Sequence, residues 1–411
     1  MGALTYVSVV VSGLLWRDRG IALSSVHHSL SSLTCSSLFQ AGLVLLAFIT
    51  LLAVAGSALP GWVHPGTLLP DGKTRLYYKC NGLLLLVLSV VAWLLGDRYF
   101  GHEVGAWAAH HCGALFLAAQ ATAFTLATYL VVRARWLDQL RRRNWFRNRE
   151  SSWLHDFILG AELNPHLLGG RLELKFFWLR PSMIGWCLLN LSIAAQQLAV
   201  HGRLSPRMLL YQVLADGYIV DYFWNEKRMT TTWDIVAEHF GLMLIWGDLV
   251  FIPFAFSLQA WCLLHDQRPL PSWHAAGILG VAALGGYLFR SANSQKDSFK
   301  RDPQRPVTRA WRWRRRTPGN RTFGEGRILA SGWWGLARHM NYTGDLLLAL
   351  SFSLPCIGGP GGAWAFFYFF YLLILLIHRS KRDDERCARK YGKSWAEYCR
   401  AVPQVFLPGI W

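Results

Sequence analysis

Side chains that suit a phosphorylated nucleotide cluster in the last third of the chain. Arg and Lys donate hydrogen bonds to phosphate oxygens, a flat Trp can stack on a planar ring, and Asn can bind amide or ring edges. The segments with these residue types are 293–296 (Asn-Ser-Gln-Lys), Lys300, 331–335 (Ser-Gly-Trp-Trp-Gly), 338–342 (Arg-His-Met-Asn-Tyr), 378–379 (His-Arg), 382–385 (Arg-Asp-Asp-Glu), and Trp395 with Tyr398. The pattern indicates a nucleotide-cofactor pocket, although a solvated basic loop or an Arg cluster at lipid headgroups has the same composition.

Neither of the common nucleotide-binding motifs accompanies this cluster. The chain has no GxGxxG after a predicted strand and no Walker loop, so a cofactor pocket here would be of neither the Rossmann nor the P-loop type. The eight cysteines form no CxxC pair and lie mostly in or beside apolar blocks. We therefore expect no disulfide framework and no metal site.

A second group of polar residues lies where the sequence is otherwise apolar. Asp216 and Asp221 flank Tyr218, Glu226 follows the same apolar block, and Asp248 lies inside the next one. Ionisable groups within membrane spans are costly and usually face a cavity or each other. Asp221 is three residues after Tyr218, so both would share a helix face. These groups are either polar contacts between helices or the lining of a polar cavity.

The elements that must position these residues are long apolar blocks separated by basic loops. Blocks of about 20 apolar residues match the length of a membrane-spanning helix. The predicted spans are 41–59, 81–95, 115–132, 183–200, 208–224, 240–264, 275–289, the interrupted stretch 328–356, and 363–377. This pattern predicts an all-α polytopic membrane protein with about ten transmembrane helices and a C-terminal cofactor-binding subdomain.

Charge supports the membrane interpretation. The net charge is +18, and 53% of the residues are hydrophobic. Basic residues gather in loops between apolar blocks, which is the positive-inside pattern and not the basic face of a nucleic-acid-binding domain. We therefore expect a membrane partner and no nucleic acid. Three regions are predicted: a divergent N-terminal segment (1–40), a bundle of transmembrane helices (41–290), and C-terminal helices, a basic loop and a tail around the cofactor (291–411).

Several longer motifs make the chain recognisable. They occur in order at 68–72 (Leu-Leu-Pro-Asp-Gly), 160–165 (Gly-Ala-Glu-Leu-Asn-Pro), 231–235 (Thr-Thr-Trp-Asp-Ile), 246–248 (Trp-Gly-Asp), 289–296, 329–335, 338–342, 344–345, 378–379 and 382–383. Over residues 41 to 411 the sequence resembles the sterol reductase family, which includes sterol Δ14-reductases, the reductase domain of lamin B receptor and 7-dehydrocholesterol reductase. It is most similar to Δ14-reductases of the plant type. An Arg-rich insertion at 305–321 departs from the family pattern.

The resemblance implies NADPH as the cofactor, a sterol from the bilayer as the substrate, and residence in the endoplasmic reticulum membrane as a multi-pass protein. It also implies an order of importance among the cofactor contacts. The first rank is Lys296, Lys300, Trp334, Asn341, Arg379 and Tyr398, and the second is Arg338, Asp345 and Arg382. Lys and Arg would hold the phosphates, including the 2′-phosphate that distinguishes NADPH from NADH.

The expected reaction is reduction of the sterol 14,15 double bond. An isolated alkene accepts hydride poorly, so it must first be protonated, and the hydride then arrives at carbon 14. This order requires a positioned acid in a dry pocket. The resemblance makes Tyr218 and Asp383 the candidate catalytic acids, and the sequence does not decide which one delivers the proton.

Three alternatives compete with this interpretation. The chain could reduce another sterol double bond, such as Δ7. It could be a membrane methyltransferase of the isoprenylcysteine carboxyl type, whose tail carries a similar Arg-His motif, although that class lacks the segments at 160–165 and 293–296. It could also be a non-catalytic sterol-binding protein. The sequence leaves the oligomeric state undetermined.

Overall fold

The computed structural model describes residues 33–68, 75–136, 152–167, 172–303, 320–359, 361–407 and 409. Most of the N-terminal segment 1–40 and most of the Arg-rich insertion 305–321 lie outside these residues. The described chain forms two compact units. Unit 1 contains residues 1–268 with 359–364, and unit 2 contains residues 269–358 with 365–411.

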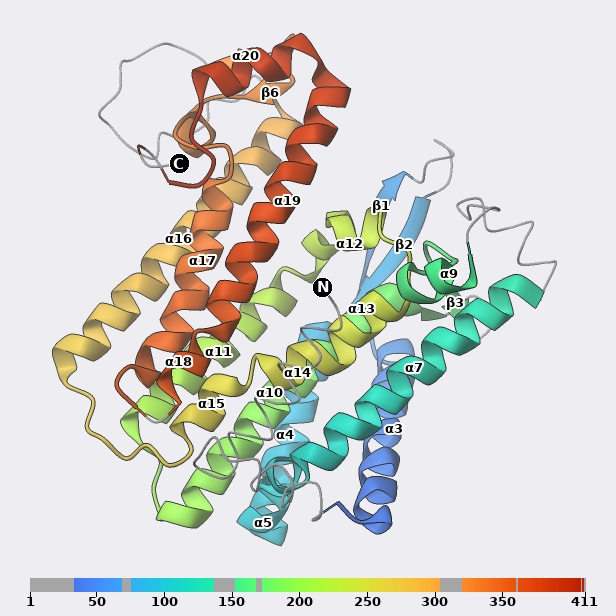
Figure 1. Ribbon diagram of the computed structural model, residues 1–411, viewed down its shortest axis with the longest axis vertical. Helices are drawn as coiled ribbons and strands as arrows, with labels where there is room; N and C mark the ends of the chain where they lie inside the picture. Colours follow the sequence, from blue (N-terminus) through green and yellow to red (C-terminus); the bar gives the residue numbers. More distant parts are fainter. Residues whose placement is uncertain are drawn as a thin grey trace. The chain divides into compact units, whose positions relative to one another are not determined.

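Unit 1 is a bundle of long helices joined by short elements (Figure 1). Its longer helices are α3 (Cys35–Ala58), α4 (Gly82–Phe100), α7 (Cys112–Trp136), α10 (Leu174–His201) and α11 (Pro206–Trp224). Its shorter helical elements are α5 (His102–Gly105), α6 (Trp107–His110), α9 (Trp153–Leu159), η2 (Glu226–Thr231), α12 (Trp233–Val236), α13 (Leu242–Trp246), η3 (Gly247–Phe251), α14 (Ile252–Ala255) and α15 (Leu258–Leu263).

Helix α10 is the central element of unit 1. It packs against α4, α11, η3 and α14, and it is the most buried of the candidate spans. Its N-terminus is set by Glu173, whose carboxylate accepts hydrogen bonds from the backbone N–H groups of Lys175 and Phe176. An acidic cap is favourable there because the helix dipole is positive at that end. Ser205, followed by Pro206, caps α11 in the same way through the N–H of Met208.

Unit 2 consists of three long helices and a C-terminal helix (Figure 1). These are α16 (Ser272–Arg301), α17 (Met340–Ser353), α19 (Phe367–Tyr391) and α20 (Lys393–Ala401), with the short elements η4 (Gly332–Gly335) and η5 (Leu354–Cys356). Helix α18 (Gly362–Ala365) lies at the boundary between the units. Helices α16 and α17 pack so closely that a Cβ atom at Gly344 would lie 2.4 Å from the backbone nitrogen of Phe289.

Among the described residues, seven helical segments are long and apolar enough to cross a membrane. They are 35–58, 82–100, 112–136, 174–201, 242–263, 272–301 and 362–391. The prediction of a mostly helical, polytopic membrane protein is therefore confirmed. Helices α11 and α17 occupy the two other predicted blocks.

Short strands are an addition to the predicted all-helical fold. In the described part of the chain, β1 (Trp62–Leu68) pairs with β2 (Arg75–Cys80), β3 (His166–Leu167) with β4 (Leu172–Glu173), and β5 (Thr322–Phe323) with β6 (Ile328–Leu329), each antiparallel. These two-stranded ribbons lie in connections between helices, where backbone groups outside helices must still find partners.

Candidate functional site

Lys296, Trp334 and Tyr398 come together in unit 2 from α16, η4 and α20. The Lys296 ammonium lies 4.3 Å from the centroid of the Trp334 ring. The indole N–H of Trp334 donates to the carbonyl of Ala292 at 2.9 Å, and the Tyr398 hydroxyl donates to the carbonyl of Trp334 at 2.8 Å. The three residues and their neighbours described below are called the C-terminal cluster. Trp334 is thus fixed on two sides, with a cation held over its face.

Arg338 connects three elements of the C-terminal cluster. Its guanidinium donates to the Asp384 carboxylate at 3.0 Å and to the Cys399 sulfur at 3.1 Å. Its backbone N–H donates to the carbonyl of Gln404. Arg338 therefore links the segment before α17 to α19 and α20. These contacts hold its neighbours in position, and the side chain itself is a cation.

Buried polar atoms in this cluster lack partners within the described chain. They include Oδ1 of Asn341, Oδ1 of Asp345, Nε2 of His339 and Nε of Arg338. The Asn341 amide nitrogen does donate to Oδ1 of Asn293, at 3.3 Å. Native proteins rarely leave buried polar atoms unpaired, so a group of them is expected where a polar ligand binds. The unpaired oxygens of Asn341 and Asp345 and the ring nitrogen of His339 could bind a polar ligand beside these basic residues.

Some of the remaining predicted site residues of unit 2 are within electrostatic range of one another. Lys296 is within electrostatic range of Lys300 and Asp383, and Asp345 is within range of Arg379. Lys300 and Arg382 are exposed, which suits cations that meet the outer phosphates of a ligand. Arg382 is three residues after Arg379, so the two share a face of α19.

His339 was not among the predicted site residues, although it lies in the predicted motif 338–342. It is 3% exposed, and its ring stacks on Tyr342 with 4.7 Å between centroids. Burial lowers the pKa of His339 to about 3, and the positive charges of Lys296 and Arg338 lower it further. The ring is therefore neutral at physiological pH, and its unpaired Nε2 can serve a ligand as donor or acceptor.

This depressed pKa has a consequence for stability. An unfolded His titrates near about 6.5, so acidification below that value protonates the unfolded chain and not the folded one. This contribution to the free energy of unfolding is complete above about pH 6.5. It is lost as the pH falls, by about 2 kcal/mol between pH 7.5 and 5. In His339→Phe, which keeps the aromatic stacking, we expect this part of the loss to vanish in denaturant titrations in detergent. Parallel curves for the two proteins would contradict it.

Tyr218 lies in unit 1 on α11, among aromatic rings. Its ring centroid is 6.2 Å from that of Trp186 on α10, and Trp186 in turn lies 5.5 Å from Phe256. The Trp186 N–H is bound to the carbonyl of Phe256 at 3.0 Å, so this ring is held in place. Tyr218 therefore combines a hydroxyl with a fixed aromatic neighbour.

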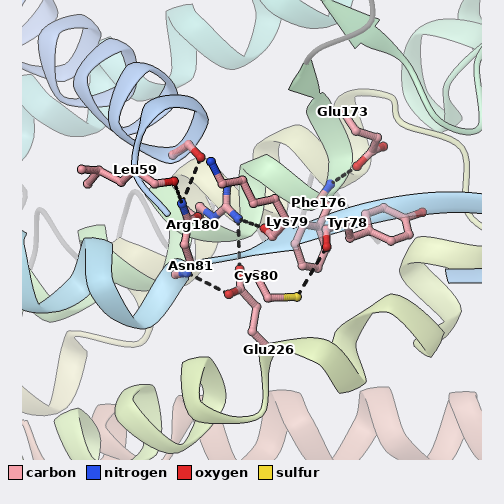
Figure 2. Close-up of polar contacts among 11 residues, drawn as sticks. Leu59, Tyr78, Lys79, Cys80, Asn81, Glu173, Phe176, Arg180 and Glu226 are labelled. Atoms are coloured by element: carbon pink, nitrogen blue, oxygen red, sulfur yellow. Dashed lines mark hydrogen bonds and ion pairs between the residues drawn. The ribbon is translucent and has the colours of Figure 1, made fainter. Parts of the chain in front are cut away.

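A buried ion pair supports the C-terminal end of α11 (Figure 2). Arg180 on α10 contacts the Glu226 carboxylate at 3.3 Å, and both side chains are about 5% exposed. Glu226 also accepts the backbone N–H of Gly82 at 2.8 Å, and Arg180 donates to the carbonyl of Lys79. Asn81 donates to the carbonyls of Gly56 and Leu59. We call Arg180, Glu226, Asn81 and these backbone groups the polar junction.

The polar junction fixes where α11 ends. A Cβ at Gly82 would lie 2.3 Å from the ring of Phe223, so α4 and α11 also meet in close contact there. Burial raises the pKa of Glu226, while Arg180 and the Gly82 N–H lower it. Glu226, one of the polar residues singled out in the sequence, is therefore a structural partner of Arg180.

Two ion pairs at the C-terminal end of α7 are also structural. Arg133 forms an ion pair with Glu162, from the motif 160–165, at 2.9 Å, and Arg135 forms one with Asp156 at 2.6 Å. Glu162 and Asp156 thus neutralise the two arginines, because buried charges need partners.

An apolar groove of about 1940 Å³ runs along unit 1 between α3, α7 and α10. Its walls are mostly aliphatic and aromatic side chains, with Lys79, Glu173 and Arg180 among the polar ones. Such a surface suits contact with hydrocarbon. Acid–base chemistry would instead need polar side chains such as those described above.

The helices of the described chain define a class, that of multi-pass membrane proteins. Residues 26–411 match the model of the ergosterol biosynthesis ERG4/ERG24 family. The chain is 43% identical over 401 residues to a Delta(14)-sterol reductase of Arabidopsis thaliana, covering 97% of this chain and 100% of that protein. The chain therefore belongs to this sterol reductase family.

Two further relatives carry the same name. A Delta(14)-sterol reductase of Methylotuvimicrobium alcaliphilum is 40% identical over 356 residues, covering 86% of this chain and 79% of that protein. A Delta(14)-sterol reductase of Mus musculus is 38% identical over 372 residues, covering 90% and 85%. The predicted family is thus confirmed.

Proposed function

We propose that this protein is an NADPH-dependent sterol Δ14-reductase. The observation that carries the proposal is the agreement between the relatives' shared name and the C-terminal cluster, which gathers cations, a fixed Trp and unpaired buried polar atoms. The product would be a sterol whose 14,15 bond is saturated, one step of sterol biosynthesis.

The cofactor would be held by the residues of unit 2. Lys296, Lys300, Arg379, Arg382 and Arg338 offer charge to the phosphates, while Trp334, Asn341, Asp345 and Tyr398 offer a stacking face and polar partners. Bound NADPH would supply the hydride that completes the reduction at carbon 14. The unpaired oxygens of Asn341 and Asp345 support this assignment, because a cofactor amide or hydroxyl could satisfy them.

Within unit 1, Tyr218 would protonate the alkene. Transfer of its hydroxyl proton to carbon 15 leaves positive charge at carbon 14. The aromatic face of Trp186, 6.2 Å from the Tyr218 ring, is suited to stabilise such a cation. Asp383 is within electrostatic range of Lys296 in the C-terminal cluster, so it is the second candidate acid, on the cofactor side.

The proposed function also assigns a role to each region of the chain. We propose that residues 41–290 form the sterol-side bundle, that 291–411 form a C-terminal cofactor-binding subdomain, and that about ten helices cross the membrane of the endoplasmic reticulum. Helices α11 and α17 would add two spans to the seven that are apolar enough by themselves.

The test is complementation of a yeast strain that lacks Δ14-reductase, with sterols analysed by mass spectrometry. We expect 14,15-unsaturated sterols to disappear, and membranes from these cells to consume NADPH in preference to NADH when given such a sterol. A Δ7-unsaturated sterol serves as the control substrate. Continued accumulation of the 14,15-alkene with well-expressed protein would contradict the proposal, and conversion of the Δ7 sterol alone would favour the Δ7 alternative.

A further inference from the structure

A short π-helical turn interrupts the sixth predicted span of unit 1. Helix α13 continues into η3, a π-helix over Gly247–Phe251, before the α-helical pattern resumes in α14. Such turns are rare and frequently mark functional sites, because one extra residue per turn re-aims side chains. Asp248, the acidic residue of this turn, lies inside a segment that is apolar enough to span a membrane.

A chain of aromatic contacts connects this turn to Tyr218. Trp246 stacks on Phe251 at 5.8 Å, and Phe251 packs against Phe256 at 5.5 Å. Phe256 packs against Trp186, whose ring meets that of Tyr218. Trp246 is itself anchored, since its N–H donates to Oε1 of Gln120 at 2.7 Å. The π-turn η3, which contains Asp248, and helix α11, which contains Tyr218, therefore both pack against α10.

Tyr222 is another tyrosine on α11. It is four residues after Tyr218, so both tyrosines share a face of α11. The charged or titratable groups within electrostatic range of Tyr222 are Asp248, Glu226, Tyr218 and Asp234. Asp234, at the start of α12, is also within range of Asp248.

These acids differ in what else they contact. Glu226 is committed to Arg180 and to the N–H of Gly82 in the polar junction. Asp248, by contrast, forms no hydrogen bond or ion pair with another residue of the described chain. Its carboxyl is therefore available to exchange a proton, and an ionisable group at such a position is a functional hypothesis by default.

We propose that Asp248 supplies the proton that Tyr218 delivers to the sterol, with Tyr222 and intervening water carrying it between them. This inference rests on the proposed function. The Tyr218 hydroxyl gives its proton to carbon 15, Tyr218 is reprotonated from Tyr222, and Tyr222 from the carboxyl of Asp248. The carboxylate is then reprotonated from solvent water, and the hydride that bound NADPH would supply would neutralise the positive charge at carbon 14. Asp248 and Tyr222 act through Tyr218, so they are positioning residues.

The test compares Asp248→Asn and Tyr222→Phe with wild type in detergent-solubilised full-length protein. We expect each variant to lower kcat about 10-fold with an unchanged KM for NADPH, less than the 10²- to 10⁴-fold that a direct acid–base group contributes. The pH profile of kcat should also differ from that of wild type, and Asp248→Glu should restore part of kcat. The matched control is Asp216→Asn, which neutralises another carboxylate of α11, one within electrostatic range of Cys187.

The outcomes separate this inference from the proposed function. If wild type reduces the sterol while Asp248→Asn and Tyr222→Phe keep its kcat and pH profile, the relay is refuted and the reductase assignment stands. An equal loss of kcat in Asp216→Asn also refutes it, since the effect would then be general. If Asp248→Asn does not fold, the kcat and pH profile of Tyr222→Phe alone test the relay. Wild type that reduces no sterol refutes the proposed function.

Discussion

Tyr218→Phe is expected to lower kcat for reduction of the 14,15-alkene by about 10²- to 10⁴-fold, the usual contribution of a general acid. The substitution removes one oxygen and keeps the ring that packs 6.2 Å from Trp186. The affinity for NADPH should not change, because the cofactor residues belong to unit 2. Single-turnover sterol reduction and NADPH titration of the same preparation measure both quantities.

The same helix offers a matched control. Tyr211 is fully buried, and its hydroxyl donates to the carbonyl of Phe256 at 3.0 Å. Tyr211→Phe also removes a hydroxyl from α11, yet it should cost about 1 kcal/mol of stability and leave kcat within about threefold. Should Tyr218→Phe behave like Tyr211→Phe, the Tyr218 hydroxyl is not the acid.

Asp383→Asn distinguishes the second candidate acid. Asp383 is within electrostatic range of Lys296, so removing its charge should first change NADPH binding. We expect a raised KM for NADPH and a smaller effect on kcat than in Tyr218→Phe. A kcat loss as large as that of Tyr218→Phe, with unchanged KM, would instead make Asp383 the proton donor.

The sequence could predict the helices because apolar block length is a local property. The predicted spans 41–59 and 115–132, for example, fall inside α3 and α7. The β1–β2 ribbon could not be predicted in this way. Its strands contain Pro65 and exposed aromatic residues, and they are held by pairing with each other and by the polar junction at Asn81, which are contacts between distant positions.

The candidate site was predictable where residue type alone indicates the chemistry. Lys296, Trp334 and Arg338 were named as cofactor contacts on composition and family motifs, and the first two meet at 4.3 Å. His339 and Tyr222 were not named. A lone His or Tyr in an apolar helix is ordinarily a core residue, and only burial and unpaired atoms around His339, or the acids around Tyr222, set these two apart.

Arg180→Met is expected to be the most destabilising of these substitutions, by about 3–5 kcal/mol at neutral pH. It removes the ion-pair partner of Glu226 and keeps a long apolar side chain in its place. The Glu226 carboxylate, about 5% exposed, would then be buried without a cation. Denaturant titration in detergent micelles measures the loss. Arg203→Met, which removes an exposed Arg bound to Gln267 at 3.2 Å, is the matched control and should cost less than about 1 kcal/mol.

The pH dependence of this loss identifies its cause. Burial already raises the pKa of Glu226 in wild type, and loss of Arg180 removes the charge that lowers it. In the variant the folded protein therefore holds Glu226 protonated, while the unfolded chain releases that proton above about pH 4.3. The cost relative to wild type is therefore largest at pH 7.5 and shrinks by up to about 1.4 kcal/mol for each unit of acidification. Adding Glu226→Gln should remove this slope, because the amide has no proton to lose. A loss that is constant from pH 7.5 to 5 would mean that Arg180 stabilises α10 and α11 by packing alone.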